Sequence, residues 1–211
     1  MQNKIDHFAI GCSGLATGVL DIESKLGVTV PGGSKHAAMS THNCVMQAGN
    51  ESFFELIAID PDAPNPGRAR WFSLDDPATQ ARLRERPRAL TWVVNTPNLD
   101  QVLENSPVDL GEVVHFERGN RTWRLTVPRD GSLPGDGLLP AFIEWSPGPH
   151  PSTGQQDLGV RLHSVRLSHP EPDRMTEHLL ALRVAHLADV SSGKVGLSFE
   201  LSSPNGTEVL D

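Results

Sequence analysis

The sequence predicts an α+β fold built from repeated βαβββ modules, and three observations lead to that prediction. Short runs of β-forming residues alternate with amphipathic helical segments in the order strand, helix, strands. Gly, Pro and Asn residues that favour turns separate these runs. The closing strand of each unit carries a glutamate between two apolar residues, and this triplet recurs as Phe54-Glu55-Leu56, Ile143-Glu144-Trp145 and Phe199-Glu200-Leu201.

The first module is predicted over residues 1–60. Lys4 to Ile10 alternates as a strand. A helix follows, which Gly27 can end and whose apolar face consists of Leu15, Val19, Ile22 and Leu26. After a loop rich in Pro and Gly, we expect a further strand over Ala37 to Thr41.

A hairpin over His42 to Asp60 is predicted to close this module. A turn centred on Gly49-Asn50 places Cys44 opposite Glu55, and it puts on one face His42, Cys44, Met46, Phe53, Glu55 and Ile57. Glu55 is the anomaly of that otherwise apolar face. An unpaired carboxylate there costs several kcal/mol of folding free energy, or its pKa rises so that it becomes neutral. Two interpretations stay open. Glu55 is a strand-edge or arginine-neutralised glutamate, or it is a metal ligand or general base.

The rest of the chain divides into a connector and two further units. The connector, residues 61–88, is rich in proline at its start and ends in a predicted helix over Ala78 to Glu85. The second module, residues 89–152, is predicted as a strand, a short helix and three strands over Leu90 to Val94, Leu99 to Glu104, Val113 to Glu117, Thr122 to Val127 and Leu138 to Trp145. Residues 153–211 predict a partial βαβ-type module over Val160 to Leu167, Pro170 to Val184 and Val195 to Leu201.

Composition limits the possible partners. The formal net charge is -8 and the sequence pI is about 5.5, so we expect no nucleic-acid partner. We also expect no membrane segment and a cytoplasmic location, because neither a leader-like start nor a long apolar run is present. Cys12 and Cys44 are the only cysteines, and we expect reduced thiols, although a single bridge between them is compatible with the sequence.

The βαβββ repeats, with His7 in the first strand and Glu55 in the fourth, resemble the vicinal oxygen chelate superfamily of glyoxalase I, extradiol dioxygenases and bleomycin-resistance proteins. Residues 5–152 resemble glyoxalase-like domains more narrowly, through Ser40-Thr41-His42-Asn43 before FFELIAIDP, through LLPAFIEW and through His150-Pro151-Ser152. The resemblance implies that two modules pack so that their curved sheets form one open, barrel-like cleft.

The resemblance also implies a divalent metal in that cleft, which would chelate two adjacent substrate oxygens and stabilise a developing oxyanion. His7, Glu55 and Glu144 match the ligand positions, and this set suits Zn, Mn, Fe or Ni. The fourth position falls at Trp92, which cannot ligate a metal, so loss of the metal is the alternative. A lower-ranked alternative pairs the first and third units through His7, Glu55, His163 and Glu200.

The candidate catalytic residues are Glu144 and His42, which shares the predicted face of Glu55 and is a possible ligand, base or orienting group. The candidate substrate-binding residues are Cys44 opposite Glu55, Trp92 as a stacking platform, and His150, which can close over the cleft. Each has an ordinary alternative: Cys44 is a small buried hydrophobic residue, Trp92 is a core residue, and His150 is an exposed linker residue. Three strand arginines either meet a substrate carboxylate or face water, namely Arg118, Arg121 and Arg124.

We therefore expect a glyoxalase-like, metal-dependent lyase, isomerase or dioxygenase that acts on a small oxygenated substrate in the cleft. The alternative is a metal-free protein of the bleomycin-resistance type that binds or sequesters a small molecule. In either case we expect a monomer or a homodimer.

Overall fold

The structure is a computed structural model that describes residues 2–211. Its elements confirm the predicted α+β class. The larger part of the chain contains, in order, β1 (Lys4–Gly11), α1 (Leu15–Leu26), β2 (Lys35–His36), β3 (Thr41–Gly49), β4 (Ser52–Ile59), α2 (Pro77–Glu85), β5 (Arg88–Asn95), α3 (Leu99–Asn105), β6 (Glu112–Arg118), β7 (Arg121–Val127) and β8 (Ala141–Trp145). The C-terminal part contains β9 (Arg161–His169), α4 (Pro172–Ala181), β10 (Ala188–Ser192), β11 (Gly196–Ser203) and β12 (Gly206–Leu210).

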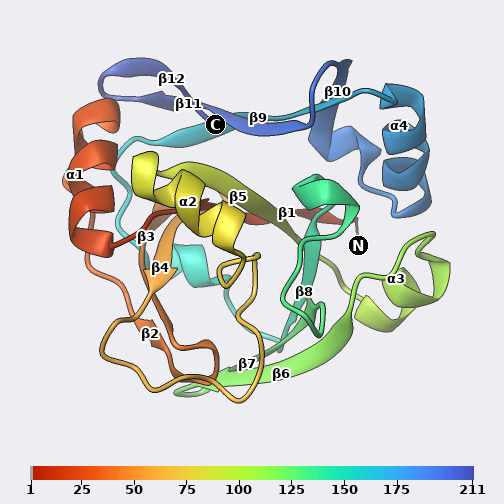
Figure 1. Cartoon of the computed structure of the whole chain (residues 1–211), viewed down its shortest axis with the longest axis horizontal. Coiled ribbons are helices and arrows are strands. Elements are labelled where there is room, and N and C mark those ends of the chain that lie inside the picture. Colours follow the sequence, from red (N-terminus) through yellow and green to blue (C-terminus); the bar gives the residue numbers. More distant parts are fainter. Residues whose placement is uncertain (1) are drawn as a thin grey trace.

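Two βαβββ modules form one eight-stranded sheet in the order β2-β3-β4-β1-β5-β8-β7-β6. Within the modules the first and last strands pair in parallel, as β1 with β4 and β5 with β8. The modules join through the antiparallel pair β1 and β5 at the centre of the sheet. The sheet curls into a half-barrel, so that β6 and β7 of the second module lie below β1 in the view of Figure 1. The resemblance implied an open cleft on the concave face of such a sheet.

Helix α1 forms where its apolar spacing predicts it. Ile22 and Leu26 are buried against the sheet, and the helix ends at Gly27, whose φ of 67° is the left-handed conformation that glycine adopts readily. The amide of Gly27 donates to the carbonyl of Glu23 and satisfies one of the last helical acceptors. The helix therefore covers the outer face of β3 and β4.

The register of the first hairpin differs from the prediction by one residue. Gly49 pairs with Ser52 across an Asn50-Glu51 turn, and an irregularity between Gln47 and Gly49 then shifts the strands, so that Val45 lies opposite Glu55. Because side chains alternate across a strand, a shift of one residue moves every side chain of β3 to the face opposite the predicted one, so Asn43 and Val45 share the face of Glu55 and Cys44 does not. The predicted shared face of Glu55 with His42, Cys44 and Met46 is therefore wrong.

The segment before this hairpin also differs from the prediction. We expected a strand over Ala37 to Thr41, but Ala37–Met39 form a single 3-10 turn and Ser40 has a left-handed φ of 49°. Only Lys35–His36 pair with β3, as the two-residue strand β2. The turn aims His36 toward the concave face, where it lines the cavity described below.

Apolar side chains pack on both faces of the large sheet. The outer face carries a cluster that joins α1, α3 and the C-terminal sheet and contains Phe8, Trp92, Phe142 and Phe199. The concave face carries a second cluster, in which α2 and the connector cover β1 and β5 with Trp71, Phe72, Leu74 and Leu83. The connector therefore closes one side of the cleft.

The C-terminal strands form a separate four-stranded sheet in the order β10-β9-β11-β12, drawn in blue along the top of Figure 1. Its strands β10 and β12 are additional to those that the sequence predicted. Phe199 packs on Phe8 with the ring centroids 4.8 Å apart, so this sheet covers the outer face of the large sheet, away from the concave face. No helix among the described residues is long and apolar enough to cross a membrane.

Candidate active site

A cavity of about 290 Å³ opens on the concave face of the large sheet. Strands β1 to β4 supply its polar floor through His7, His36, Asn43 and Glu55. The second module and the connector supply most of its aromatic and cationic wall, namely Trp71, Phe72, Arg118, Arg121, Trp123 and Trp145. Small-molecule sites typically combine such an apolar wall with a few converging polar groups.

His7 and Glu55 form the centre of the floor. They project from neighbouring strands β1 and β4, and both side chains are largely buried. His7 Nε2 lies 3.6 Å from Glu55 Oε2, which is too long for a direct hydrogen bond. The His7 ring also stacks on Phe53, with the centroids 4.5 Å apart, which fixes its plane. Each of the two groups can therefore hydrogen-bond a substrate atom while the other stays in place.

Asp6 holds His7 from behind. The Asp6 carboxylate is fully buried and accepts a hydrogen bond from His7 Nδ1 at 2.6 Å. It also accepts from Trp145 Nε1 at 2.7 Å and from His150 Nε2 at 2.9 Å. Because the backbone amide of Ser152 donates to His150 Nδ1, the proton of His150 lies on Nε2, which faces Asp6.

This arrangement separates the pKa values of Asp6 and His7. Burial raises the pKa of Asp6, but the hydrogen bonds from His150 and His7 outweigh it and lower the pKa to about 2. Burial lowers the pKa of His7, but the hydrogen bond to Asp6 and the charges of Asp6 and Glu55 outweigh it and raise the pKa above its usual value. Asp6 is therefore an anion at neutral pH, and the site favours the imidazolium form of His7.

Asn43 fixes the other side of Glu55, and His36 lies nearby without a hydrogen bond to it. The amide of Ser34 donates to Asn43 Oδ1 at 2.9 Å, which orients the Asn43 side chain so that Nδ2 donates to Glu55 Oε1 at 2.7 Å. His36 Nδ1 lies 3.0 Å from Thr41 Oγ1, and His36 Nε2 lies 4.0 Å from Glu55 Oε1. Burial lowers the pKa of His36 to about 4, although the charge of Glu55 opposes this, so His36 is neutral at pH 7.

The aromatic wall is continuous. The ring of Trp71 stacks on Phe72, with centroids 5.3 Å apart, and the ring of Trp123 lies 5.1 Å from that of Trp145. Phe72 and Ser73 both have left-handed backbone, with φ of 58° and 54°, which costs on the order of 1–3 kcal/mol per residue. The amide of Ser73 donates to Gly131 at 2.7 Å and anchors this turn, which places Trp71 and Phe72 over the cavity.

Two predicted residues lie outside the cavity. Glu144 is on the opposite face of β8 from the cavity-lining Trp145, and its carboxylate accepts from the Leu99 amide at 2.7 Å and from Arg124 at 2.8 Å. Trp92 has no exposed surface, and its Nε1 donates to the carbonyl of Leu138 at 2.8 Å in the outer core. Glu144 therefore serves to anchor α3, and Trp92 cannot stack on a molecule in the cleft.

The other candidate residues also lie elsewhere than the sequence predicted. Cys44 is opposite Leu56 and belongs to the outer core, and His42 is opposite Ala58 and does not line the cavity. His150 is buried, as the partner of Asp6, rather than exposed in a linker or closed over the cleft. The lower-ranked pair lies on the C-terminal sheet, where His163 is exposed and Glu200 pairs with Arg166.

The donor groups do not assemble the predicted metal site. His7 and Glu55 converge, but Glu144 lies behind the sheet and is neutralised by Arg124. Over residues 2–211, no group of three His, Cys, Asp or Glu side chains is arranged to hold a metal ion. The residues present therefore do not fit the three-ligand site.

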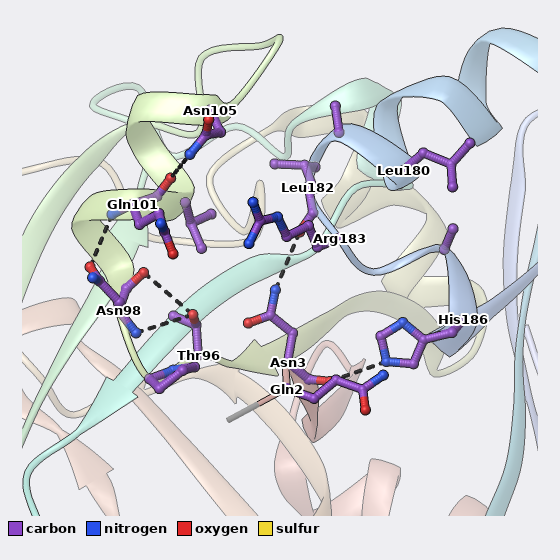
Figure 2. Close-up of a pocket in the computed structure, with 14 residues that line it drawn as sticks. Gln2, Asn3, Thr96, Asn98, Gln101, Asn105, Leu180, Leu182, Arg183 and His186 are labelled. Atoms are coloured by element: carbon purple, nitrogen blue, oxygen red, sulfur yellow. Dashed lines mark hydrogen bonds between the residues drawn. The ribbon is translucent and has the colours of Figure 1, made fainter.

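A second cavity of about 470 Å³ lies between α3, the end of α4 and the N-terminal strand. Its polar side chains are mainly amides that already serve the backbone, as Figure 2 shows: Asn3 donates to the Leu182 carbonyl, and Asn98 Oδ1 caps α3. His186 contacts the carbonyl of Asn3 and ties the C-terminal part to the residue before β1. Within the described part of the chain no carboxylate lines this cavity, so its contacts are structural and the cleft is the better candidate site.

Comparisons with known proteins agree with this fold. Residues 5–183 match the family model for a glyoxalase-like domain. A hypothetical protein from Staphylococcus aureus is 16% identical, with 100% of this chain and 86% of that protein covered and a TM-score of 0.60. The methylmalonyl-CoA epimerase of Streptomyces coelicolor is 14% identical. The comparison covers 74% of this chain and 99% of the epimerase chain, with a TM-score of 0.45. No curated protein matches the sequence. At 16% identity, the similarity to the Staphylococcus aureus protein shows the fold alone.

Proposed function

Because the chain belongs to the glyoxalase-like domain family of the vicinal oxygen chelate superfamily, we propose that it is an enzyme that moves a proton at a carbon beside a carbonyl group. Isomerases and lyases share this step. The observation that carries the proposal is the His7 and Glu55 pair, 3.6 Å apart at the floor of an aromatic cavity. A positioned acid and base of this kind typically contribute a factor of about 10² to 10⁴ in rate.

In the proposed reaction Glu55 is the general base. Its carboxylate takes the proton from the substrate carbon as the C–H bond breaks, and the electron pair moves onto the carbonyl oxygen. His7 donates a proton or a hydrogen bond from Nε2 to that oxygen, and Asp6 holds the ring by its Nδ1 and stabilises the imidazolium. Asn43 keeps the Glu55 carboxylate oriented. Return of the proton to another position completes an isomerisation, and loss of a leaving group completes a lyase reaction.

Deuterium exchange tests this proposal. Phenylpyruvate is a suitable probe because its methylene protons lie beside a carbonyl, and proton NMR in D₂O measures their exchange. We expect the wild-type protein to accelerate the exchange and Glu55→Gln to lose about 10² or more of that acceleration. Glu177→Gln, an exposed change on α4, is the matched control and should exchange at the wild-type rate. Equal rates in wild type and Glu55→Gln would contradict the role of Glu55.

Metal dependence stays a prediction from the family resemblance. Elemental analysis of wild type and Glu55→Ala, purified without a histidine tag, tests it directly. About one equivalent of Zn, Mn, Fe or Ni in the wild type alone would support a metal enzyme with His7 and Glu55 among its ligands.

A metal-free binding protein is the second candidate function, and the aromatic wall is the observation that favours it. Trp71, Trp123 and Trp145 offer stacking surfaces that do not require turnover. A sequestering protein would bind phenylpyruvate without accelerating its exchange, and Glu55→Gln would leave its affinity unchanged.

A further inference from the structure

The hairpin of β6 and β7 carries two arginines at its turn. Arg118 and Arg121 lie directly opposite each other across the turn, and both line the cavity. Among the described residues, no carboxylate lies within salt-bridge distance of either guanidinium, whereas Arg124 on the next part of β7 pairs with Asp100 and Glu144. Like charges directly opposite in a strand pair are destabilising. An anion between the two would offset that repulsion.

Arg118 is an exposed residue at the mouth of the cavity, and its guanidinium lies against the aromatic wall. Its guanidinium carbon lies 5.7 Å from the centroid of Trp123, a cation–π contact with the aromatic wall. Burial lowers the pKa of Arg118, and the charge of Glu55 raises it, so the guanidinium is partly desolvated and faces the same cavity as Glu55. The group stays fully charged at neutral pH.

The two ends of the cavity differ in chemistry. The two arginines lie at the end of the hairpin, while Glu55 and His7 form the floor on β4 and β1. Flat aromatic surfaces adjoin both ends, because Trp123 lies under Arg118 and Phe53 stacks on His7. Flat π surfaces favour a flat apolar group, and paired guanidiniums favour a carboxylate through bidentate hydrogen bonds. The Glu55 carboxylate, whose charge acts on Arg118, disfavours a more highly charged anion.

We propose that the cleft selects a small planar carboxylate, with an aromatic ring or a conjugated chain, whose carboxylate binds Arg118 and Arg121 while the reacting carbon faces Glu55 and His7. This substrate class rests on the proposed function for the reacting carbon, but the binding of the anion does not. A cavity of about 290 Å³ suits a single ring with a short side chain.

Isothermal titration calorimetry with three probes tests the substrate class. Benzoate has the ring and the charge, benzyl alcohol has the ring alone, and acetate has the charge alone. We expect benzoate to bind at least about tenfold more tightly than either of the others, and to bind more weakly as salt is added. Equal affinities for benzoate and benzyl alcohol would overturn the proposal.

Arginine variants test whether the carboxylate of benzoate binds Arg118 and Arg121. Arg118→Gln and Arg121→Gln should each weaken benzoate binding by about tenfold, the loss expected for one charge-assisted hydrogen bond. Arg174→Gln, an exposed change on α4 far from the cleft, is the matched control and should bind as the wild type does. Both cleft variants alter hairpin-end residues outside the buried core, so thermal unfolding should confirm that they fold. Wild-type affinity in both would also overturn the proposal.

The two proposals can fail separately. Glu55→Gln should bind benzoate at least as tightly as the wild type, because it removes a negative charge, while it loses deuterium exchange. If benzoate binds through the arginines and no exchange occurs, the proposed function is wrong and the substrate class stands. If exchange depends on Glu55 but neither arginine affects binding, the substrate class is wrong and the proposed function stands.

Discussion

Asp6→Asn is the change that most sharply tests the electrostatics of the site. The pKa of Asp6 is lowered from 3.8 to about 2 in the folded protein. Each unit of pKa corresponds to about 1.4 kcal/mol, so the ionised carboxylate contributes on the order of 2 kcal/mol to the free energy of unfolding. Because the folded pKa is the lower one, this contribution is complete above about pH 4 and is lost as the pH falls through 2.

The expected result is a pH-dependent difference between wild type and Asp6→Asn. Urea unfolding followed by tryptophan fluorescence should give a variant less stable by roughly 2 kcal/mol at pH 6, and linkage reduces that difference to about half at pH 3. At low pH the protonated wild-type carboxyl and the introduced amide are alike in charge. The amide oxygen can still accept a hydrogen bond from Trp145, so the ring geometry of the site is retained.

Asp157→Asn is the matched control. Arg161 lowers the pKa of Asp157 to about 2 as well, but Asp157 is on the surface. Water and salt screen such a pair, so the change should have a much smaller effect on stability. If wild type and Asp6→Asn differ in free energy of unfolding by the same amount at pH 6 and at pH 3, folding does not lower the pKa of Asp6. That result would contradict the prediction.

Three further predictions concern residues around the site. Glu144→Gln should lower the free energy of unfolding by about 1 kcal/mol through its lost bonds to α3 and Arg124, and calorimetry should show unchanged benzoate affinity. Trp92→Phe should cost about 1–3 kcal/mol in urea unfolding, because the Leu138 carbonyl loses its donor, again without a change in benzoate affinity. His36 should titrate in NMR near its lowered pKa of about 4, and its burial should destabilise the fold as the pH falls below 6.5.

The modules and α1 were predictable because their signals are local. Helical spacing ends at Gly27, and strand runs end at turn residues, so element type and order follow from sequence. Glu55 was also predictable as an anomaly, since a carboxylate between Phe53 and Ile57 needs a partner. That partner, Asn43, was missed because the irregularity after Gln47 shifts the register, and a residue count across the turn does not show it.

Glu144 illustrates a second limit of prediction from the sequence pattern. Its triplet, Ile143-Glu144-Trp145, has the same pattern as Phe54-Glu55-Leu56, but the pattern does not fix which face of the sheet the glutamate takes. In β8 the flanking Ile143 and Trp145 face the cavity, so Glu144 faces α3. Which side of β8 faces the cleft follows from the packing of two modules, which are distant in sequence. The Asp6 contacts to His150 and Trp145 are likewise long-range and carry no local signal.

The most direct test of the account is the protonation of His7. Nitrogen-15 NMR of labelled imidazoles, in wild type and Glu55→Gln, gives the pKa of this ring. We expect His7 in the wild type to titrate above its usual 6.5, and the midpoint to fall in Glu55→Gln because one of the raising charges is removed. A wild-type His7 that is already neutral at pH 6.5, with no change in the variant, would contradict the charged acid–base pair on which the proposed function depends.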